Sequence, residues 1–252
     1  MEERNFKRPN SEFMEKIPDP KTSLLSDKAI LRNIENGKII IDPFNIKNLG
    51  TNSYDVCLGD VYFREQINDL GSNIYNLYSQ EEVSRIWGKP QKAENAGEWM
   101  KKTGIKLENI FDDDEIIFIE PGETILAITQ EFIGGKETIT TGMHARSSFG
   151  RNFIEVCKCA GLGDTGFINR WVMEITSNSR RFTMPLVVGR RIAQIMFWDT
   201  EGTLKSYESN GKYQISNNIE ELKKSWIPDI MLPKLYRDYE IAEKKQKNNK
   251  TL

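Results

Sequence analysis

Seven short apolar segments follow one another between residues 115 and 198, and almost no helical pattern separates them. They are rich in the β-branched and aromatic residues that favour strands. Pro121-Gly122, Gly134-Gly135 and Gly189 supply turn residues between them. Many short strands joined by turns predict a mainly β fold, either a sandwich, a jelly roll or a barrel. The segments are EIIFIE (115–120), TILAITQ (124–130), ETITTG (137–142), FIEVCKC (153–159), RWVMEITS (170–177), FTMPLVV (182–188) and RRIAQIMFW (190–198).

The first ordered element is predicted just after residue 22. Residues 1–22 are polar and contain prolines, so we expect a tail there. Ser26 is a favourable N-cap and Gly37 a favourable C-terminal stop, which predicts one short helix over 27–36. Two strand-like segments follow it, KIIID (38–42) and SYDVCLGD (53–60).

The pattern changes between residues 64 and 112, where Asn, Gln, Glu and Lys with isolated aromatic residues replace the alternation. We interpret 64–112 as an insertion with helical pieces near 80–87 and 94–102, packed on the outside of the β core. The predicted organisation is a single domain over 23–236, followed by a C-terminal helix and tail over 237–252. The aromatic side chains expected to attach the insertion to the core are Tyr75, Tyr78, Trp87 and Trp99. A ligand cage built from them is the alternative.

The charge balance excludes some partners. The chain has 35 Lys and Arg against 37 Asp and Glu, a formal net charge of −2. Because affinity for a polyanion needs clustered positive charge, we expect no nucleic acid polymer as a partner. No apolar run approaches the roughly 20 residues that a membrane-spanning helix needs, so we expect no membrane partner. The N-terminus is charged where a secretory signal would be apolar, and we expect a cytoplasmic protein.

The histidine and cysteine content limits the possible chemistry. His144 is the single histidine, and Cys57, Cys157 and Cys159 are the three cysteines. The H-x-E and P-C-x-x-C ligand pattern does not occur in the sequence, so we expect no zinc site. A Ser-His-Asp site would need His144 as its base, and the sequence has no accompanying G-x-S-x-G.

Residues 146–151 bring two guanidinium groups, two hydroxyls and a glycine into six positions. Guanidinium groups match phosphate oxygens and a glycine lets the backbone approach a ligand, so this segment is a candidate phosphate cradle. R-S-S also occurs in ordinary turns, and a turn is the alternative. Asp164 lies between glycines in AGLGDTGF, where it either contacts a ligand or only forms a turn.

Glu174 lies in the middle of the strand-like segment RWVMEIT. Strand alternation places Trp171, Met173 and Ile175 on one face and Glu174 on the other. A carboxylate there is costly to bury unless it is paired or used, and burial raises its pKa toward the range of a general base. A solvent-facing strand position is the alternative.

Several motifs occur in an order that resembles a known family. They are TSLLSDKAILRNIENGKIIIDPF, TNSYDVCLGD, ARSSFGR, AGLGDTGF with the following MEI, GRRIAQIMFW and YESNGKYQ. This series resembles the dCTP deaminases of the trimeric dUTPase superfamily, and several motifs in the right order are more specific than any one of them. The resemblance spans about residues 23–62 and 116–214 and leaves the insertion and both ends uncovered.

The resemblance implies a distorted β-barrel or jelly-roll subunit, a homotrimer, and active sites shared between subunits. It implies that Glu174 is the catalytic glutamate and that Ser147 and Arg151 lie near the reacting base. The C-terminal segment with YESNGKYQ would close over the site of a neighbouring subunit. The residues expected to bind the nucleotide are Arg146, Ser148, Ala160, Asp164, Phe167, Gln194, Tyr207, Lys212 and Gln214.

The activity implied is deamination of dCTP to dUTP and ammonia by a glutamate base without zinc, with Mg²⁺ bound through the substrate triphosphate. A bifunctional enzyme that gives dUMP and pyrophosphate, or a plain dUTPase, is the alternative. AGLGDTGF is more similar to the bifunctional enzymes and the dUTPases, whereas plain dUTPases generally lack a glutamate at the position of Glu174. A non-catalytic nucleotide-binding module is a third, less favoured hypothesis.

Overall fold

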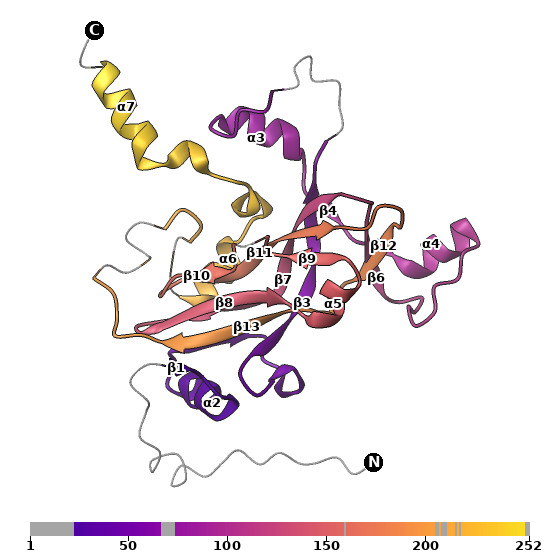
Figure 1. The fold of residues 1–252 in the computed structure, drawn as a ribbon, viewed down its shortest axis with the longest axis horizontal. Helices are drawn as coiled ribbons and strands as arrows, with labels where there is room; N and C mark the ends of the chain where they lie inside the picture. The colour runs from indigo at the N-terminus through magenta and orange to yellow at the C-terminus, as the bar shows by residue number, and fades with distance from the viewer. Residues whose placement is uncertain are drawn as a thin grey trace.

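The computed structural model describes residues 23–66, 74–158, 160–204, 207, 211–214, 216 and 218–249. The predicted tail over 1–22, Cys159 and the last three residues lie outside the described residues. Within the described part, ten strands form one large sheet and three form a smaller one (Figure 1). This architecture confirms the mainly β class that the sequence predicts.

The large sheet follows the order β10-β8-β13-β3-β7-β11-β9, with β1 on β13, β2 on β7 and β4 on β3. Register shifts within β3, β11 and β13 bend these strands, and the sheet curls. The strands are β1 (Ser23–Leu24), β2 (Ile39–Asp42), β3 (Tyr54–Arg64), β4 (Gln91–Lys92), β7 (Thr124–Gly135), β8 (Ile139–Ala145), β9 (Ile154–Val156), β10 (Leu162–Gly163), β11 (Ile168–Ser177) and β13 (Arg191–Asp199). The smaller sheet consists of β12 (Met184–Val187), β6 (Glu115–Ile119) and β5 (Glu94–Asn95).

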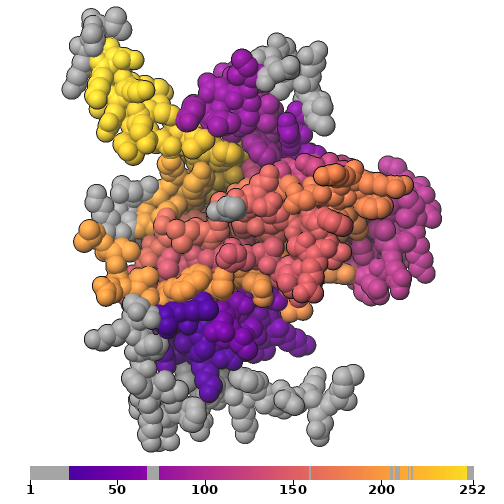
Figure 2. Space-filling model, viewed as in Figure 1, coloured from indigo at the N-terminus to yellow at the C-terminus, as the bar shows by residue number. Residues whose placement is uncertain are grey.

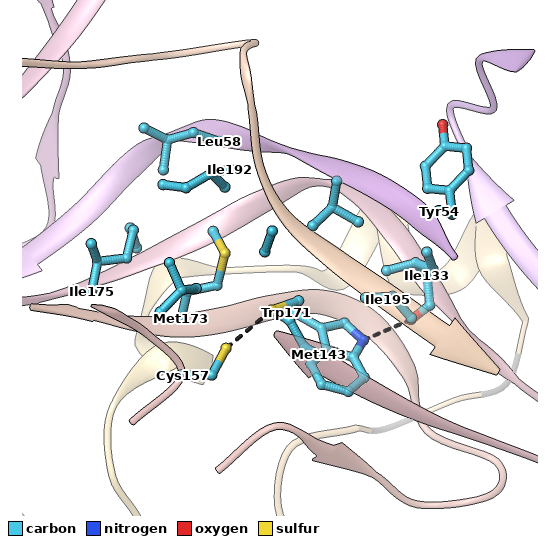
Figure 3. Close-up of a cluster of buried hydrophobic side chains, with 14 of the residues drawn as sticks. Tyr54, Leu58, Ile133, Met143, Cys157, Trp171, Met173, Ile175, Ile192 and Ile195 are labelled. Carbon is cyan, nitrogen blue, oxygen red and sulfur yellow. Dashed lines mark hydrogen bonds between the residues drawn. The ribbon is translucent and has the colours of Figure 1, made fainter. Parts of the chain in front are cut away.

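The main core is built from the inward-facing residues of the large sheet (Figure 3). Trp171 is 4 % exposed, and its indole nitrogen donates a hydrogen bond of 3.0 Å to the carbonyl of Ile133. The Cys157 thiol is equally enclosed and lies 3.0 Å from the sulfur of Met143. Burial raises the pKa of Cys157 to about 12, so this thiol stays protonated.

The helix predicted over 27–36 is present as α2 (Asp27–Glu35). The Ser26 side chain accepts a hydrogen bond from the Ala29 amide, and Gly37 has the positive φ of 72° that ends such helices. Ile30 is fully buried in the main core. The predicted cap and stop therefore set the ends of this helix, and Ile30 packs it against the sheet.

The insertion contains two short helices, α3 (Gln80–Trp87) and α4 (Ala96–Thr103), which confirms that it is partly helical. Both lie outside the large sheet (Figure 1). Trp99 of α4 packs on Phe118 of the smaller sheet, with the ring centroids 4.6 Å apart. Trp87 packs instead on a second small core at the outer face of β3 and β7, formed by Val61, Phe63, Leu126, Ile128 and Met231.

The C-terminal part returns to that second core through Met231. Trp226 lies under the Arg170 guanidinium, which is 4.8 Å from the ring centroid. Figure 2 shows α7 projecting from the body of the molecule.

None of the helices in the described part of the chain has the length and apolar character that crossing a bilayer requires. The remaining helical elements are η1 (Ile46–Asn48), α5 (Ser147–Arg151), α6 (Ile219–Ser225), η3 (Pro228–Met231), η4 (Leu235–Arg237) and α7 (Tyr239–Asn249).

Gly134-Gly135 does not form the predicted turn. Both glycines lie inside β7, and the chain turns immediately afterwards, where Glu137 has a positive φ of 57°. A Cβ atom on Gly134 would lie 1.9 Å from the carbonyl oxygen of Phe167. The glycines therefore permit a close backbone approach between β7 and the start of β11, a role that local turn statistics do not separate from a turn.

Gly134→Ala is expected to lower the free energy of unfolding by about 1–3 kcal/mol, because the added methyl group overlaps backbone that must shift. Urea denaturation followed by tryptophan fluorescence measures the change. Gly150→Ala is the control, since a Cβ at that position meets no heavy atom within 4 Å. Equal loss of stability in both variants would contradict the close approach.

Candidate active site

A pocket of about 490 Å³ opens on the outer face of β7 and β11. Five residues predicted from the sequence line it: Ala160, Asp164, Phe167, Glu174 and Tyr207. The structure thus brings together side chains from β11, from the loop before it and from the C-terminal part of the chain. The pocket combines an aromatic wall with two carboxyl groups, which suits a ligand with a flat ring and hydroxyl or amine groups.

Glu174 lies in the wall of this pocket, as strand alternation predicts. Trp171, Met173 and Ile175 point into the main core, and Glu174 points to the opposite face of β11. Its side chain is half-buried. Burial raises the pKa of Glu174, and the positive charge of Lys158 opposes this shift in part. A carboxyl group with a raised pKa in a pocket can act as a general base near neutral pH.

Phe167 connects the pocket wall to the main core and to the C-terminal segment. Its ring meets Trp171 edge-on at 5.6 Å and Tyr207 edge-on at 5.3 Å between centroids. The Phe167 amide donates to the carbonyl of Asp164 over 2.9 Å, which closes a turn with Gly166 at φ 94°. This turn leaves the Asp164 carboxylate exposed at the pocket, three residues from the ring.

The C-terminal segment lies against the pocket of its own chain. Its closure over the site of a neighbouring subunit stays a prediction. Tyr207 and Tyr213 both line the pocket. Gln214 is 6 % exposed; its amide oxygen accepts from the Ile168 amide over 2.6 Å, and its amide nitrogen donates to the Gly166 carbonyl over 2.9 Å. These bonds hold the segment in place because a buried amide must satisfy its polar atoms within the protein.

The structure gives the predicted nucleotide contacts Gln214 and Lys212 partners within their own chain. The amide of Gln214 is bonded to the backbone of the pocket wall. The ammonium group of Lys212 forms an ion pair with Asp238. Neither residue is among those that line the pocket, and both belong to the described part of the chain.

The R-S-S segment lies on a different surface. Ser147, Ser148 and Arg151 belong to α5 and are exposed. Arg146 precedes α5 and lines a separate cavity of about 730 Å³. All of residues 146–151 are described, and none of them lines the pocket that holds Glu174. A single chain therefore does not bring the R-S-S segment to Glu174.

Asp55 holds this second surface together. Its carboxylate lies 3.3 Å from Nε of Arg146 and 3.0 Å from Nη1 of Arg191. Gln194 donates to the same carboxylate over 3.0 Å. Gln194 is thus fixed beside Arg146 on the β13 side of the molecule, and not beside Glu174.

Sequence reasoning missed the part of the pocket wall that comes from outside the predicted motifs. Trp87 of the insertion lines the pocket, as do Met231 and Pro233 of the C-terminal segment. The aromatic residues of the insertion predict that it packs on the core. The sequence does not show which part of the sheet Trp87 contacts, because long-range packing decides that. Thr124 of β7 and Arg170 of β11 also line the pocket, and both are ordinary strand residues in the sequence.

Glu131 is a second buried carboxylate that the sequence analysis did not single out. It is 2 % exposed and accepts a hydrogen bond of 3.0 Å from the Cys57 amide. Burial raises its pKa, and hydrogen bonds and Arg170 oppose that shift. Glu131 lies between Gln130 and Phe132 and interrupts an otherwise apolar strand. This interruption is the sequence signal that could have identified it.

A model of the dCTP deaminase-like family matches residues 24–200 of this sequence. The chain belongs to this family. A family member from Hydrogenobaculum sp., named dCTP deaminase, dUMP-forming, is 32 % identical over 176 residues, which cover 69 % of this chain and 81 % of that protein. One of the same name from Clostridium beijerinckii is 29 % identical over 217 residues, covering 86 % of this chain and 99 % of that protein.

Among solved structures, 2'-deoxycytidine 5'-triphosphate deaminase from Agrobacterium tumefaciens is similar to this chain with a TM-score of 0.49 and 17 % identity. The match covers 71 % of this chain and 49 % of that one, so this chain spans about half of its length. Among the described residues of the present family member, no group of three or more His, Cys, Asp and Glu side chains is arranged to hold a metal ion.

Proposed function

We propose that this chain deaminates dCTP and forms dUMP, with Glu174 as the general base. The observation that carries the proposal is the half-buried Glu174 carboxyl in a pocket shared with Asp164 and Phe167. Membership of the dCTP deaminase-like family supports the nucleotide substrate. The relatives named dUMP-forming favour dUMP rather than dUTP as the product.

The deamination step follows from the pocket chemistry. Glu174 takes a proton from a water molecule, whose oxygen forms a bond to C4 of the cytosine ring. The proton passes to N3, giving a tetrahedral intermediate that carries both the hydroxyl and the amino group. Collapse transfers a proton to the amino group and breaks the C4–N bond, so that ammonia leaves and a uracil ring remains. Phe167 would lie along the deoxyribose, and Asp164 would accept a hydrogen bond from the 3′-hydroxyl.

The second step removes the terminal phosphates. A water oxygen bonds to the α-phosphorus while the bond to the α–β bridging oxygen breaks, which gives dUMP and pyrophosphate. Asp164 has two carboxylate oxygens, and the one that does not bind the 3′-hydroxyl can orient this water. Mg²⁺ at a nucleotide commonly takes most of its ligands from phosphate oxygens and water, and only one or two from protein carboxylates. We therefore expect Mg²⁺ to enter the site together with the substrate triphosphate.

A homotrimer with shared sites supplies the residues that the single-chain pocket lacks. Ser147, Ser148 and Arg151 are exposed on α5, away from Glu174 of their own chain. In a closed ring, the α5 surface of one subunit meets the pocket of the next. Arg151 would then stabilise the negative charge of the tetrahedral intermediate, and Ser147 would hold the water.

Separation of the products by anion-exchange chromatography tests the proposal. Incubation of the wild-type chain with dCTP and Mg²⁺ is expected to give dUMP, pyrophosphate and ammonia in equal amounts. Accumulation of dUTP would leave the deaminase and remove the second step. Unchanged dCTP together with cleaved dUTP would indicate a plain dUTPase, and binding of dCTP without any turnover would indicate a non-catalytic module.

A further inference from the structure

Two threonine hydroxyls form a pair at the edge of the Glu174 pocket. The side-chain oxygens of Thr124 and Thr176 are 2.8 Å apart, a hydrogen bond in which either group can donate. Thr124 of β7 lines the pocket, whereas Thr176 of β11 is 6 % exposed and borders a separate cleft beside Pro121 and Gly122. The pair therefore presents one hydroxyl to the pocket and keeps the other buried.

The register of β7 and β11 places this pair beside Glu174. Thr176 is opposite Thr124, and Glu174 is opposite Leu126. Thr176 and Glu174 are two residues apart on one strand, so they share a face. Thr124 and Glu174 are diagonal neighbours across the two strands, about 7–8 Å apart at the backbone, a span that the two side chains together can bridge.

The hydrogen count leaves one donor for the pocket. Two threonine hydroxyls carry two O–H groups, and the bond between them uses one. Among the described residues, neither hydroxyl has a second hydrogen-bond partner. When Thr176 donates to Thr124, the O–H of Thr124 is left to point into the pocket, where an ionised carboxylate is the strongest acceptor.

We propose that Thr124 is a positioning residue for Glu174: its hydroxyl, oriented by Thr176, donates a hydrogen bond to the Glu174 carboxylate and holds it toward the reacting ring. The inference rests on the proposed function, because it assigns Thr124 a part in the same general-base step. The proposed bond joins Thr124 to the base and not to the substrate. Its effect is to fix the carboxylate rotamer and to favour the ionised form that can accept a proton.

Other groups around Glu174 set the background for this effect. Lys158 acts on Glu174 through its positive charge, and the Cys157 thiol faces it from the core side. The remaining titratable groups that line the pocket are Asp164, Arg170, Tyr207 and Tyr213. Arg170 already donates to the Thr129 carbonyl over 2.8 Å and packs on Trp226. Glu155 of β9 is opposite Thr176. Asn169 of β11 also lines the pocket, and its amide nitrogen donates to the Tyr213 carbonyl over 2.9 Å. The hydroxyl pair is thus a neutral donor on the strand pair that carries Glu174, two residues along β11 from it.

The test compares the pH dependence of kcat for ammonia release from dCTP in four variants. Thr124→Val keeps the side-chain shape but removes the donor, so the acid limb of the profile is expected to move up by about one pH unit, with kcat on that limb about tenfold lower at equal pH and KM unchanged. Thr124→Ser is expected to restore both. Thr176→Val, which frees Thr124 to rotate, is expected to have a smaller effect. Thr103→Val removes a hydroxyl on α4, far from the pocket, and is the control.

The results separate the positioning role of Thr124 from the proposed function. An unchanged acid limb in Thr124→Val, with the wild-type chain active, would overturn the positioning role and leave the proposed function intact. Equal losses in Thr124→Val and Thr124→Ser without a pH shift would also overturn it, since packing alone would then be responsible. A wild-type chain that releases no ammonia from dCTP would overturn the proposed function and, with it, this inference.

Discussion

Glu174→Gln is expected to lower the rate of ammonia release from dCTP by about 10²–10⁴-fold or more, because the amide keeps the shape of the side chain but cannot accept the proton of the attacking water. Binding of dCTP is expected to change little, since Phe167, Asp164 and Tyr207 still line the pocket. Stopped or coupled ammonia assays measure the rate, and equilibrium dialysis with dCTP measures the binding. Near wild-type ammonia release would remove Glu174 from the mechanism.

Glu98→Gln is the matched control for this substitution. Glu98 lies in the first turn of α4 and does not line the pocket. The control variant is expected to retain wild-type activity. Cleavage of dUTP by Glu174→Gln is expected to continue, because hydrolysis at the α-phosphorus needs no base at C4 of the ring. Loss of both reactions in Glu174→Gln would indicate a damaged pocket rather than a missing base.

The pH dependence of the wild-type enzyme also tests the assignment of Glu174 as the general base. Burial raises the pKa of Glu174 above its ordinary value. A base must be ionised to accept a proton, so kcat for deamination is expected to fall as the pH decreases through this raised pKa. The acid limb should therefore lie above the range of an ordinary glutamate and should be absent from the residual activity of Glu174→Gln. Rate measurements from pH 4 to 9, with protein stability checked at each pH, supply the profile.

Local patterns predicted the elements whose geometry is decided within a few residues. The Ser26 cap and Gly37 stop bound α2 because capping depends only on neighbouring backbone groups. The orientation of Glu174 followed from strand alternation, which has a period of two residues wherever the strand is regular. The motif around Asp164 lies at the pocket for the same reason, since its turn is closed by the nearby Phe167 amide.

Long-range packing decided what the patterns did not. The sequence around Gly134 predicts a turn. In the structure Gly134 instead leaves room for the Phe167 carbonyl, which belongs to a segment more than thirty residues away. The sequence motif does not reveal that the Gln214 amide is bonded to the backbone at Gly166 and Ile168. Trp87 reaches the pocket because the second core offers an apolar surface there. None of these partners is encoded within the segment itself.

Mixing Glu174→Gln chains with Arg151→Ala chains is expected to restore deamination that neither variant has alone. In the proposed trimer, each site takes Glu174 from one subunit and Arg151 from its neighbour. A site is intact when its Glu174 comes from an Arg151→Ala chain and its Arg151 from a Glu174→Gln chain. Random exchange in an equal mixture makes about one quarter of the sites intact, so about a quarter of the wild-type activity is expected.

The choice of the second variant follows from the structure. Arg151 is exposed on α5 and does not line the pocket of its own chain, whereas Tyr207 and Tyr213 do. A Glu174→Gln mixture with Tyr213→Ala is therefore the control: both residues belong to one pocket, so a site that receives either mutated chain there stays defective and no activity should return. Subunit exchange is verified by mass spectrometry of the mixed assembly. An active monomer in light scattering, or exchange without recovery in the Arg151→Ala mixture, would exclude shared sites and would require that α5 reach Glu174 within one chain.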